Sequence, residues 1–338
     1  MTTVSVIMPT YNRAAFIRDA IDSVLGQTYP HFELIIIDDG STDGTSEIVA
    51  PYLTDERIRY VRQENAGAAS ARNHGIALGR GDMVAFIDSD DIWDREKLRI
   101  QTAVMDALPE VGIVCSDFSA LRGSRILETS HIRSFFSVLD EYALTYDDVF
   151  SRLLDLPVEG LDKDDAVYWG SIFSTMLFGN IILTSTCLCR AVVFNTTGVF
   201  DTSLETLEDY DLFLKITKVF PVALISKPLI LYRYSENQLS GEKYFDKVCA
   251  NLIKIFIKFI STIDDEQFLR DNRKKIRNRL GHYYAQQGYF HFSREELRES
   301  AQCYRQSIRN NLSDYKSYVY LFFSLMPVGI SRFIRKLK

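Results

Sequence analysis

The hydrophobic and polar positions near the N-terminus follow two alternating periods. Residues 4–8 and 33–37 are short, mostly apolar runs, which are typical of buried strands. Between them, Ile17 and Ile21 recur at the spacing of a helix, which we expect to end by Pro30. A strand, a helix and a second strand of these lengths predict two parallel strands joined by a right-handed crossover.

The same alternation continues to the stretch that ends at Asp88. We expect a helix over 45–52, a strand over 58–61, a helix that carries Arg72, and a strand that ends at Asp88. This order predicts an α/β fold with a mostly parallel sheet and helices on both faces. In such sheets, ligands bind beyond the carboxyl ends of the strands. Three polar loops would meet at that edge: 10–13, 38–42 and 88–91.

Three carboxylates follow the last of these strands, at Asp88, Asp90 and Asp91. Like charges this close repel one another unless a cation lies between them. Carboxylate oxygens suit Mg²⁺ or Mn²⁺, which keep open positions for substrate phosphates. One aspartate could instead cap a helix that begins at Ile92. Because three carboxylates exceed the need of a cap, the pattern favours a metal or phosphate site.

The second half of the chain has a less regular pattern. The acidic clusters within residues 117–175 favour a solvated face over catalytic carboxylates. Residues 180–190 alternate as a strand does. Glu208 and Asp209 precede an apolar helical face, so they are either capping acids of that helix or functional carboxylates.

The C-terminal part is helical and basic. After two strands at 222–226 and 229–234, we expect helices over 248–263, 268–280, 283–292 and 295–310. Residues 1–242 contain 20 Lys and Arg against 36 Asp and Glu, a net charge of −16, whereas residues 243–338 contain 19 against 9, a net charge of +10. The basic part would therefore face nucleic acid, an anionic membrane surface or the acidic half of the chain. Nucleic acid is disfavoured, because the positive charges are scattered over amphipathic helices.

Composition and the ends of the chain narrow the class of protein. The 338 residues are 46% hydrophobic and 25% charged, which is typical of a globular chain with two domains or one domain with an appendage. Five cysteines match neither a disulfide framework nor a zinc spacing, so any metal would have oxygen ligands. No leader is visible before residue 4, so we expect a cytoplasmic protein. The apolar residues 318–325, followed by Arg332 and Arg335, are consistent with a peripheral anchor on the inner face of the membrane.

Four linked motifs resemble the family 2 glycosyltransferases of GT-A fold. They are VSVIMPTYNR at 4–13, DDGSTD at 38–43, NxGxxxARN at 65–73 and FIDSDD at 86–91. The resemblance implies a GT-A domain over 1–240, with a nucleotide-sugar half at 1–116 and an acceptor half at 117–240. A helical extension over 241–338 would follow it.

The resemblance also implies roles for single residues on the donor side. Asp39 would accept a hydrogen bond from uracil, and Tyr11 would stack on the base. Asp90 and Asp91 would share the ribose and metal contacts with Mn²⁺ or Mg²⁺, and Arg72 would orient these carboxylates. The residues expected to bind the nucleotide are Pro9, Tyr11, Arg13, Asp39, Arg72, Asp88, Ser89 and Asp90. Turn formation is the alternative role for Asp38, Ser41 and Asp43.

The remaining roles concern the base and the leaving diphosphate. By resemblance, Asp209 would be the catalytic base, with Glu208 as the second candidate. Many relatives have a histidine close behind a Tyr-Arg sequence at the end of the domain, but here Tyr234 follows and no histidine is near in the chain. Arg233 is therefore the candidate for a diphosphate contact.

These features predict a metal-dependent inverting glycosyltransferase of cell-envelope polysaccharide synthesis. It would move a sugar from a nucleotide-diphosphate sugar, in the first place a UDP-sugar, to a hydroxyl of a glycan or lipid-linked acceptor, with one base to deprotonate that hydroxyl. A sugar-phosphate nucleotidyltransferase would need a glycine-rich basic loop where this chain has Pro-Thr-Tyr-Asn-Arg. A non-catalytic nucleotide-sugar-binding scaffold is the third possibility, against which the intact carboxylates argue.

Overall fold

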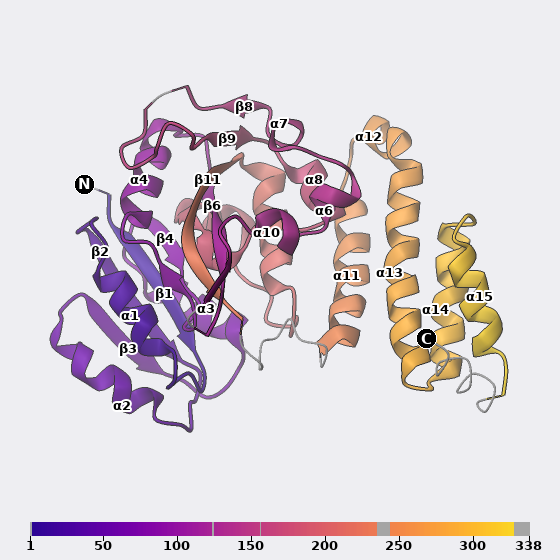
Figure 1. Cartoon of the computed structure of the whole chain (residues 1–338), viewed down its shortest axis with the longest axis horizontal. Helices are drawn as coiled ribbons and strands as arrows, with labels where there is room; N and C mark the ends of the chain where they lie inside the picture. The colour runs from indigo at the N-terminus through magenta and orange to yellow at the C-terminus, as the bar shows by residue number, and fades with distance from the viewer. Residues whose placement is uncertain (1, 124, 156, 235–243, 328–338) are drawn as a thin grey trace. The chain divides into compact units, whose positions relative to one another are not determined.

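The structure is a computed structural model that describes residues 2–123, 125–155, 157–234 and 244–327. The chain divides into two compact units, Met1–Glu236 and Asn237–Lys338 (Figure 1). The first unit combines a sheet with helices, and the described part of the second consists of helices.

One mixed sheet contains the described strands of the first unit. They are β1 (Val4–Thr10), β2 (Phe32–Asp38), β3 (Ile58–Arg62), β4 (Met83–Phe86), β5 (Ile92–Trp93), β6 (Ile113–Arg122), β7 (Arg125–Glu128), β8 (Arg152–Leu153), β9 (Val167–Gly170), β10 (Leu188–Arg190) and β11 (Val222–Arg233). Their order is β3-β2-β1-β4-β10-β6-β11-β9-β8, with β5 beside β11 and β7 beside β6. The predicted parallel pairing of β1 with β2 is confirmed, and β3 and β4 extend the parallel part. Both β1 and β2 are almost wholly buried, as strands covered on both faces must be.

The helices of the first unit lie between these strands in the chain. They are α1 (Ile17–Leu25), α2 (Thr45–Val49), α3 (Ala68–Leu78), α4 (Lys97–Ala107), α5 (Ile132–Phe135), α6 (Val138–Glu141), α7 (Tyr146–Val149), α8 (Phe173–Phe178), α9 (Val192–Thr197) and α10 (Glu208–Val219), with 3₁₀ turns η1 (Ala50–Thr54) and η2 (Thr184–Thr186). Helix α1 ends before Gly26, earlier than expected from Pro30. The helix expected over 45–52 changes to 3₁₀ geometry at Ala50, where Pro51 begins the new turn.

Three local predictions were wrong. Ile92 and Trp93 form strand β5, which pairs with Ile230 and Leu231, so no helix begins there for an aspartate to cap. Residues 180–190 form the turn η2 and only a three-residue strand, β10. The two strands expected after residue 221 are one strand, β11, with register shifts on both sides of Pro228, because proline cannot donate to the ladder.

The helices of the second unit differ in their bounds from those that the sequence pattern predicts. They are α11 (Phe245–Ile260), α12 (Glu266–Asp271), α13 (Arg273–Ser293), α14 (Leu297–Asn310) and α15 (Tyr315–Ser324). The break expected near residue 281 is absent, and α13 continues through it. A Cβ at Gly288 would lie 3.2 Å from the ring of Tyr304, so this glycine allows α14 to pack closely. Arg332 and Arg335 lie outside the described residues, within which no helix is long and apolar enough to cross a membrane.

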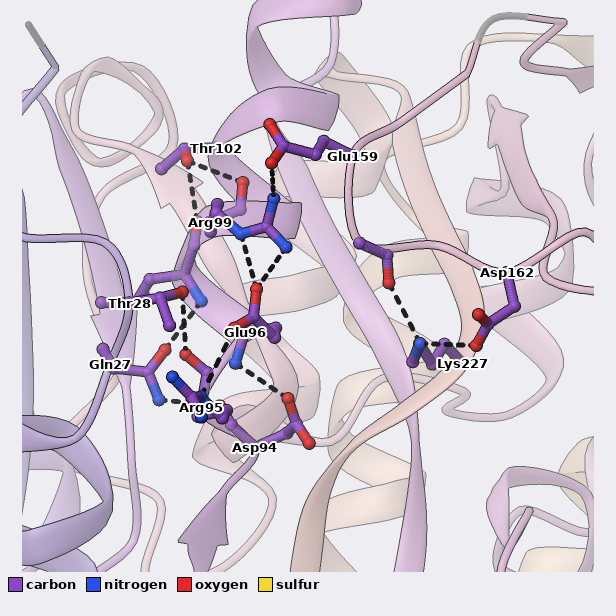
Figure 2. Close-up of polar contacts among 12 residues, drawn as sticks. Gln27, Thr28, Asp94, Arg95, Glu96, Arg99, Thr102, Glu159, Asp162 and Lys227 are labelled. Atoms are coloured by element: carbon purple, nitrogen blue, oxygen red, sulfur yellow. Dashed lines mark hydrogen bonds and ion pairs between the residues drawn. The ribbon is translucent and has the colours of Figure 1, made fainter.

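The connection between β8 and β9 is attached to two other elements of the first unit. Lys227 of β11 donates to the Gly160 carbonyl at 3.0 Å and to Asp162 at 2.9 Å, and Arg99 of α4 contacts Glu159 at 2.6 Å (Figure 2). These bonds hold a stretch of the predicted acceptor half against α4 and β11.

Candidate functional site

The loops after β1, β2 and β4 come together because these strands are parallel neighbours. Thr10 lies opposite Asp38 in the register, and Ile7 lies opposite Phe86. The first two loops are joined directly, since the amide of Thr42 donates to Asn12 Oδ1 at 2.8 Å. The predicted meeting of polar loops at this edge is therefore what the structure shows.

The second loop directs Asp38 and Asp43 to its own turn and Asp39 to the loop after β3. Asp38 accepts from the amide of Ser41 at 2.7 Å, and Asp43 accepts from the amide of Thr45 at 3.0 Å, which confirms the turn interpretation for both aspartates. Asp39 Oδ1 accepts from Gln63 Nε2 at 2.8 Å and from the amide of Ala66 at 2.9 Å. Asp39 Oδ2 accepts from the amide of Gly67 at 2.8 Å.

These bonds leave Asp39 with little capacity to accept further hydrogen bonds. Each carboxylate oxygen has about two acceptor positions. Oδ1 already takes two donors, whereas Oδ2 takes one and can accept one more. Nearby, Tyr11 has 45% of its surface exposed and is accessible to a planar ligand. The nucleotide contacts of Asp39, Tyr11 and the buried Pro9 stay predictions.

Arg72 joins the loop 88–91, called the carboxylate loop below, to the start of α10. One guanidinium nitrogen lies 2.8 Å from Asp88 Oδ1, and the other lies 2.8 Å from Glu208 Oε1. The guanidinium is buried, with 6% of the residue exposed. Burial lowers the pKa of Arg72, but the negative charges of Asp88 and Glu208 outweigh it and hold the pKa above its usual value. Arg72 therefore stays charged and fixes both carboxylates.

The other two carboxylates of the loop differ in access. Asp90 Oδ2 lies 3.5 Å from Arg13 Nε, and Asp91 Oδ1 accepts from the amide of Arg233 at 3.0 Å. Asp91 is 1% exposed, and its Oδ2 is a buried oxygen without a hydrogen-bond partner. Burial first, and then neighbouring aspartates of the loop, raise the pKa of Asp90 and that of Asp91. The positive charges of Arg13 and Arg233 oppose this rise at Asp90.

Arg233 is held against the backbone of the same loop. Its Nε donates to the Asp90 carbonyl at 2.9 Å, and its guanidinium also pairs with Asp19 at 2.9 Å. Ser89 is 4% exposed within this loop. The diphosphate contact of Arg233 and the nucleotide contact of Ser89 stay predictions.

Glu208 and Asp209 occupy the first turn of α10, as expected. The preceding residue, Leu207, has a φ of 62°, a left-handed conformation that is costly for a leucine and is found mainly where surrounding structure enforces it. Asp209 Oδ1 accepts from the amide of Tyr210 at 2.7 Å, and Oδ2 accepts from Thr184 Oγ1 at 3.1 Å. Burial raises the pKa of both acids, while Arg72 opposes the rise.

The sequence does not predict several other contacts around the site. Asn73 forms a pair of hydrogen bonds with the backbone of Phe200, at 2.9 and 3.0 Å. His131 Nε2 lies 2.8 Å from the hydroxyl of Tyr234, so a histidine that is distant in the sequence lies beside this tyrosine, although none is near it in the chain. Only the NxGxxxARN motif marked Asn73, and no pattern marked His131.

A hollow of about 280 Å³ begins where the carboxylate loop ends. It is lined by Trp93, Asp94, Arg95, Ser119, Pro228, Ile230 and Leu231. The carbonyl of Asp94 accepts from Gln27 Nε2 at 2.7 Å, and the carbonyl of Arg95 accepts from the amide of Thr28 at 2.9 Å (Figure 2). None of the four residues Asp88–Asp91 lines this hollow, so it is separate from the carboxylates.

Comparison with known proteins identifies the family. Residues 5–145 match the family described as glycosyl transferase family 2. An uncharacterised glycosyltransferase of Rickettsia typhi is 30% identical over 238 residues, which are 70% of this chain and 66% of that protein. The chain belongs to glycosyl transferase family 2. The putative teichuronic acid biosynthesis glycosyltransferase TuaG of Bacillus subtilis is 51% identical over 104 residues, 30% of this chain and 41% of TuaG.

The family match does not extend over whole relatives. A glycosyltransferase of Rickettsia felis is 50% identical over 105 residues, which are 31% of this chain but 17% of that protein. The chain therefore spans less than half the length of this relative and of TuaG.

Solved structures show that the fold is the GT-A fold of this family. TarS residues 1–349 from S. aureus superpose with a TM-score of 0.59 at 17% identity, covering 98% of this chain and 87% of that one. The mannosyltransferase PcManGT from Pyrobaculum calidifontis, in complex with GDP-Man and Mn²⁺, gives a TM-score of 0.54 at 19% identity, covering 99% and 87%. The expected α/β fold class is confirmed.

Proposed function

We propose that this protein is a metal-dependent inverting glycosyltransferase that moves a sugar from a UDP-sugar to a hydroxyl of a glycan or lipid-linked acceptor. The observation that carries the proposal is Arg72, which holds Asp88 of the donor-side loop and Glu208 beside Asp209 at 2.8 Å each. One buried cation thus brings together the two groups of carboxylates that such a transfer requires. The UDP-GlcNAc bound in a structure of TarS supports the choice of donor.

On the donor side, Asp39 and Tyr11 would recognise the base. The free acceptor position of Asp39 Oδ2 would take the imide N–H of uracil, while the bonds from Gln63 and Gly67 hold the carboxylate in place. The exposed ring of Tyr11 would stack on the base. Arg13 and Arg233 lie against Asp90 and would contact a diphosphate bound at this loop.

The carboxylate loop fits a divalent cation. Asp88 and Asp90 keep 29% and 11% of their side chains exposed, and their mutual repulsion contributes to the raised pKa of Asp90. The described residues contain no group of three or more His, Cys, Asp or Glu arranged for a metal, but Mg²⁺ and Mn²⁺ sites often use one or two carboxylates with substrate phosphates. Bound there, the ion would supply positive charge to the leaving diphosphate.

The structure favours different tasks for the three aspartates. We expect Asp88 and Asp90 to offer oxygens to the ion, because both reach the surface. Asp91 is buried and bonded to the amide of Arg233, so it would support the loop from within. Its predicted direct metal contact stays a prediction.

Asp209 would remove the proton of the acceptor hydroxyl. Burial raises its pKa and so makes it a better proton acceptor, while Arg72 and the bonds from Tyr210 and Thr184 favour the ionised form in which it can act. Glu208 already forms an ion pair with Arg72 at 2.8 Å, so Asp209 is the better candidate for the base.

The membrane contact proposed for the second unit rests on the apolar face of α15. Tyr315, Phe322 and Leu325 are 70%, 58% and 61% exposed. The opposite face carries Ser317 and Ser324, which bond to serines of α14. An exposed aromatic and aliphatic face in a basic segment suits the interface of an anionic membrane.

Calorimetry with nucleotides tests the enzymatic proposal. We expect UDP, but not GDP, CDP or dTDP, to bind tightly, and only with Mn²⁺ or Mg²⁺ present. In Asp90→Asn, the UDP binding that requires Mn²⁺ or Mg²⁺ should be lost. Asp209→Asn should bind UDP as the unmodified protein does, yet its turnover of a UDP-sugar should fall by about 10²-fold or more.

Three results would contradict this proposal. Absence of binding by all four nucleotides would exclude a nucleotide-sugar enzyme. Unchanged turnover in Asp209→Asn would exclude Asp209 as the base, and tight UDP binding without any turnover would favour the non-catalytic scaffold.

A further inference from the structure

Three consecutive hydroxyl residues form the turn η2 inside the first unit. Thr184, Ser185 and Thr186 are 2%, 0% and 1% exposed. Buried hydroxyls need hydrogen-bond partners, since an unpaired one is costly. The partners of this turn lie on both sides of the candidate site.

Ser185 bonds to the carboxylate loop. Its Oγ accepts from the amide of Asp88 at 2.8 Å, and its carbonyl accepts from Trp93 Nε1 at 3.1 Å. Ser185 therefore contacts the beginning of the sequence 88–91 through its side chain, and Trp93, two residues beyond Asp91, through its carbonyl.

Thr184 bonds to the proposed base. Its Oγ1 donates to Asp209 Oδ2 at 3.1 Å, while Asp209 Oδ1 accepts from the amide of Tyr210. Both oxygens of the base are thus oriented, one by its own helix and one by η2. Thr184 and Ser185 are adjacent, so a single turn holds the base and the donor loop.

Helix α4 supports the turn from behind. Gln101 Nε2 donates to the Thr186 carbonyl at 2.7 Å, and Lys97 Nζ donates to Gln101 Oε1 at 2.6 Å. Thr186 Oγ1 closes the turn on the Leu183 carbonyl at 2.6 Å. Lys97 and Gln101 are themselves fully buried, so the support has little freedom to move.

We propose that the turn Thr184–Thr186 positions the donor loop and the base relative to each other, with Ser185 acting on the loop and Thr184 on Asp209. This inference rests on the proposed glycosyl transfer and adds positioning residues to it. A direct contact of either hydroxyl with substrate is not required.

The two positioning residues should have separable effects, because they touch different partners. The charged groups that face Asp209 are Arg72 from α3, Asp88 from the loop and Glu208 from its own helix. Thr184 adds a neutral donor that favours the carboxylate form. Without it the pKa of Asp209 would rise further, so more of the base would be protonated at a given pH.

The test uses the full chain and the release of UDP from a UDP-sugar with water as acceptor, measured against pH. In Thr184→Val, the acid limb of kcat should move to higher pH by about one unit, the value of one hydrogen bond to a charged group. Thr184→Ser keeps the hydroxyl and should restore the original limb. In Ser185→Ala, the Kd for UDP with Mn²⁺ should rise about tenfold while the acid limb stays in place.

Matched controls separate these effects from general loss of packing. Thr217→Val removes a buried hydroxyl from the same helix as Asp209, and Ser116→Ala removes a buried hydroxyl without a partner. Both should leave the acid limb and the Kd unchanged. Thermal unfolding identifies any variant that fails to fold, in which case Thr184→Ala replaces the valine.

The outcomes distinguish the inference from the proposed function. If the unmodified protein neither binds UDP nor releases it from a UDP-sugar, the proposed function fails. If it is active and folded Thr184 and Ser185 variants behave as the controls do, the positioning role alone is overturned.

Discussion

Two buried basic residues of this protein, Arg72 and Lys97, differ in protonation because their partners differ. Arg72 contacts two carboxylates, and the pKa of its guanidinium is raised in spite of burial. Lys97 is also buried, but its neighbours are the amide of Gln101 and the ring of Trp93, 4.0 Å from Nζ. Burial lowers the pKa of Lys97 to about 7. Without a carboxylate partner, desolvation therefore decides the protonation of Lys97.

Stability should depend on pH through Lys97. Between the folded pKa of about 7 and the unfolded value of 10.5, the unfolded chain binds more protons than the folded one, so the free energy of unfolding rises with pH. Relative to Lys97→Met, the unmodified protein should gain about 1 kcal/mol per pH unit between pH 7 and about pH 9.

Urea unfolding of both proteins across this range measures the difference. Comparing the pair cancels the opposite effect of the buried cysteines, whose raised pKa values lower stability at alkaline pH. Parallel pH profiles would show that Lys97 remains protonated in the folded protein.

The sequence predicted that Arg72 orients carboxylates, but it did not predict the role of Lys97. Arg72 belongs to a motif, whereas Lys97 begins an amphipathic helix where a lysine normally lies at the surface. The hydroxyls of Thr184 and Ser185 gave no signal either. They lie within residues 180–190, which the sequence pattern predicts as a strand, and the partners of Thr184 and Ser185 are 25 and 97 residues away in the chain.

At the scale of elements, α3 connects three parts of the first unit. Gly67 precedes it and bonds to Asp39, Arg72 contacts Asp88 and Glu208, and Asn73 binds the backbone of Phe200. Gly75 lies against β1, since a Cβ there would be 2.4 Å from Ile7 Cγ2. Alternating strands and helices could be predicted from hydrophobic period, but these cross-links depend on residues brought together only by folding.

Substitution of Gly67 tests the link between α3 and Asp39. Gly67 has φ of 88° and ψ of 165°, which only glycine adopts without strain, although no atom lies within 4 Å of a Cβ built there. Gly67→Ala should cost about 1–3 kcal/mol of stability and shift the amide that holds Asp39. We expect UDP affinity to fall by about tenfold as well.

Gly123→Ala is the matched control, because Gly123 has φ of 60°, open space around it and a position between β6 and β7. It should lose stability and keep UDP affinity, as seen by thermal unfolding and calorimetry. Equal UDP affinity in both variants would argue against Asp39 as a nucleotide contact.

At the scale of the whole molecule, the two units carry opposite charge. Residues 1–242 have a net charge of −16, and residues 243–338 have +10. Arg273 and Lys274 begin α13 without a hydrogen bond or ion pair among the described residues, although positive charge is unfavourable at a helix N-terminus. This charge and the apolar face of α15 both favour an anionic surface as partner.

Vesicle sedimentation tests this partner with the full chain. We expect binding to vesicles that contain phosphatidylserine and much weaker binding to neutral vesicles or at about 1 M salt, where charges are screened within about 3 Å. Phe322→Ser combined with Leu325→Ser should reduce binding about tenfold or more, because two exposed apolar side chains no longer enter the interface.

Leu153→Ser combined with Val219→Ser is the control, since these residues of the first unit are 57% and 56% exposed. This pair should leave vesicle binding unchanged. Equal loss in both pairs, or binding that ignores lipid charge, would exclude the α15 face as an anionic membrane contact.

The bridge made by Arg72 also determines how much chain the site needs. Its two carboxylates are 16 and 136 residues away, and the family match ends at residue 145, before Glu208. A fragment limited to the matched residues would leave half of the guanidinium without its partner. During synthesis, the complete site can close only after α10 has left the ribosome, so no shorter nascent chain would be active.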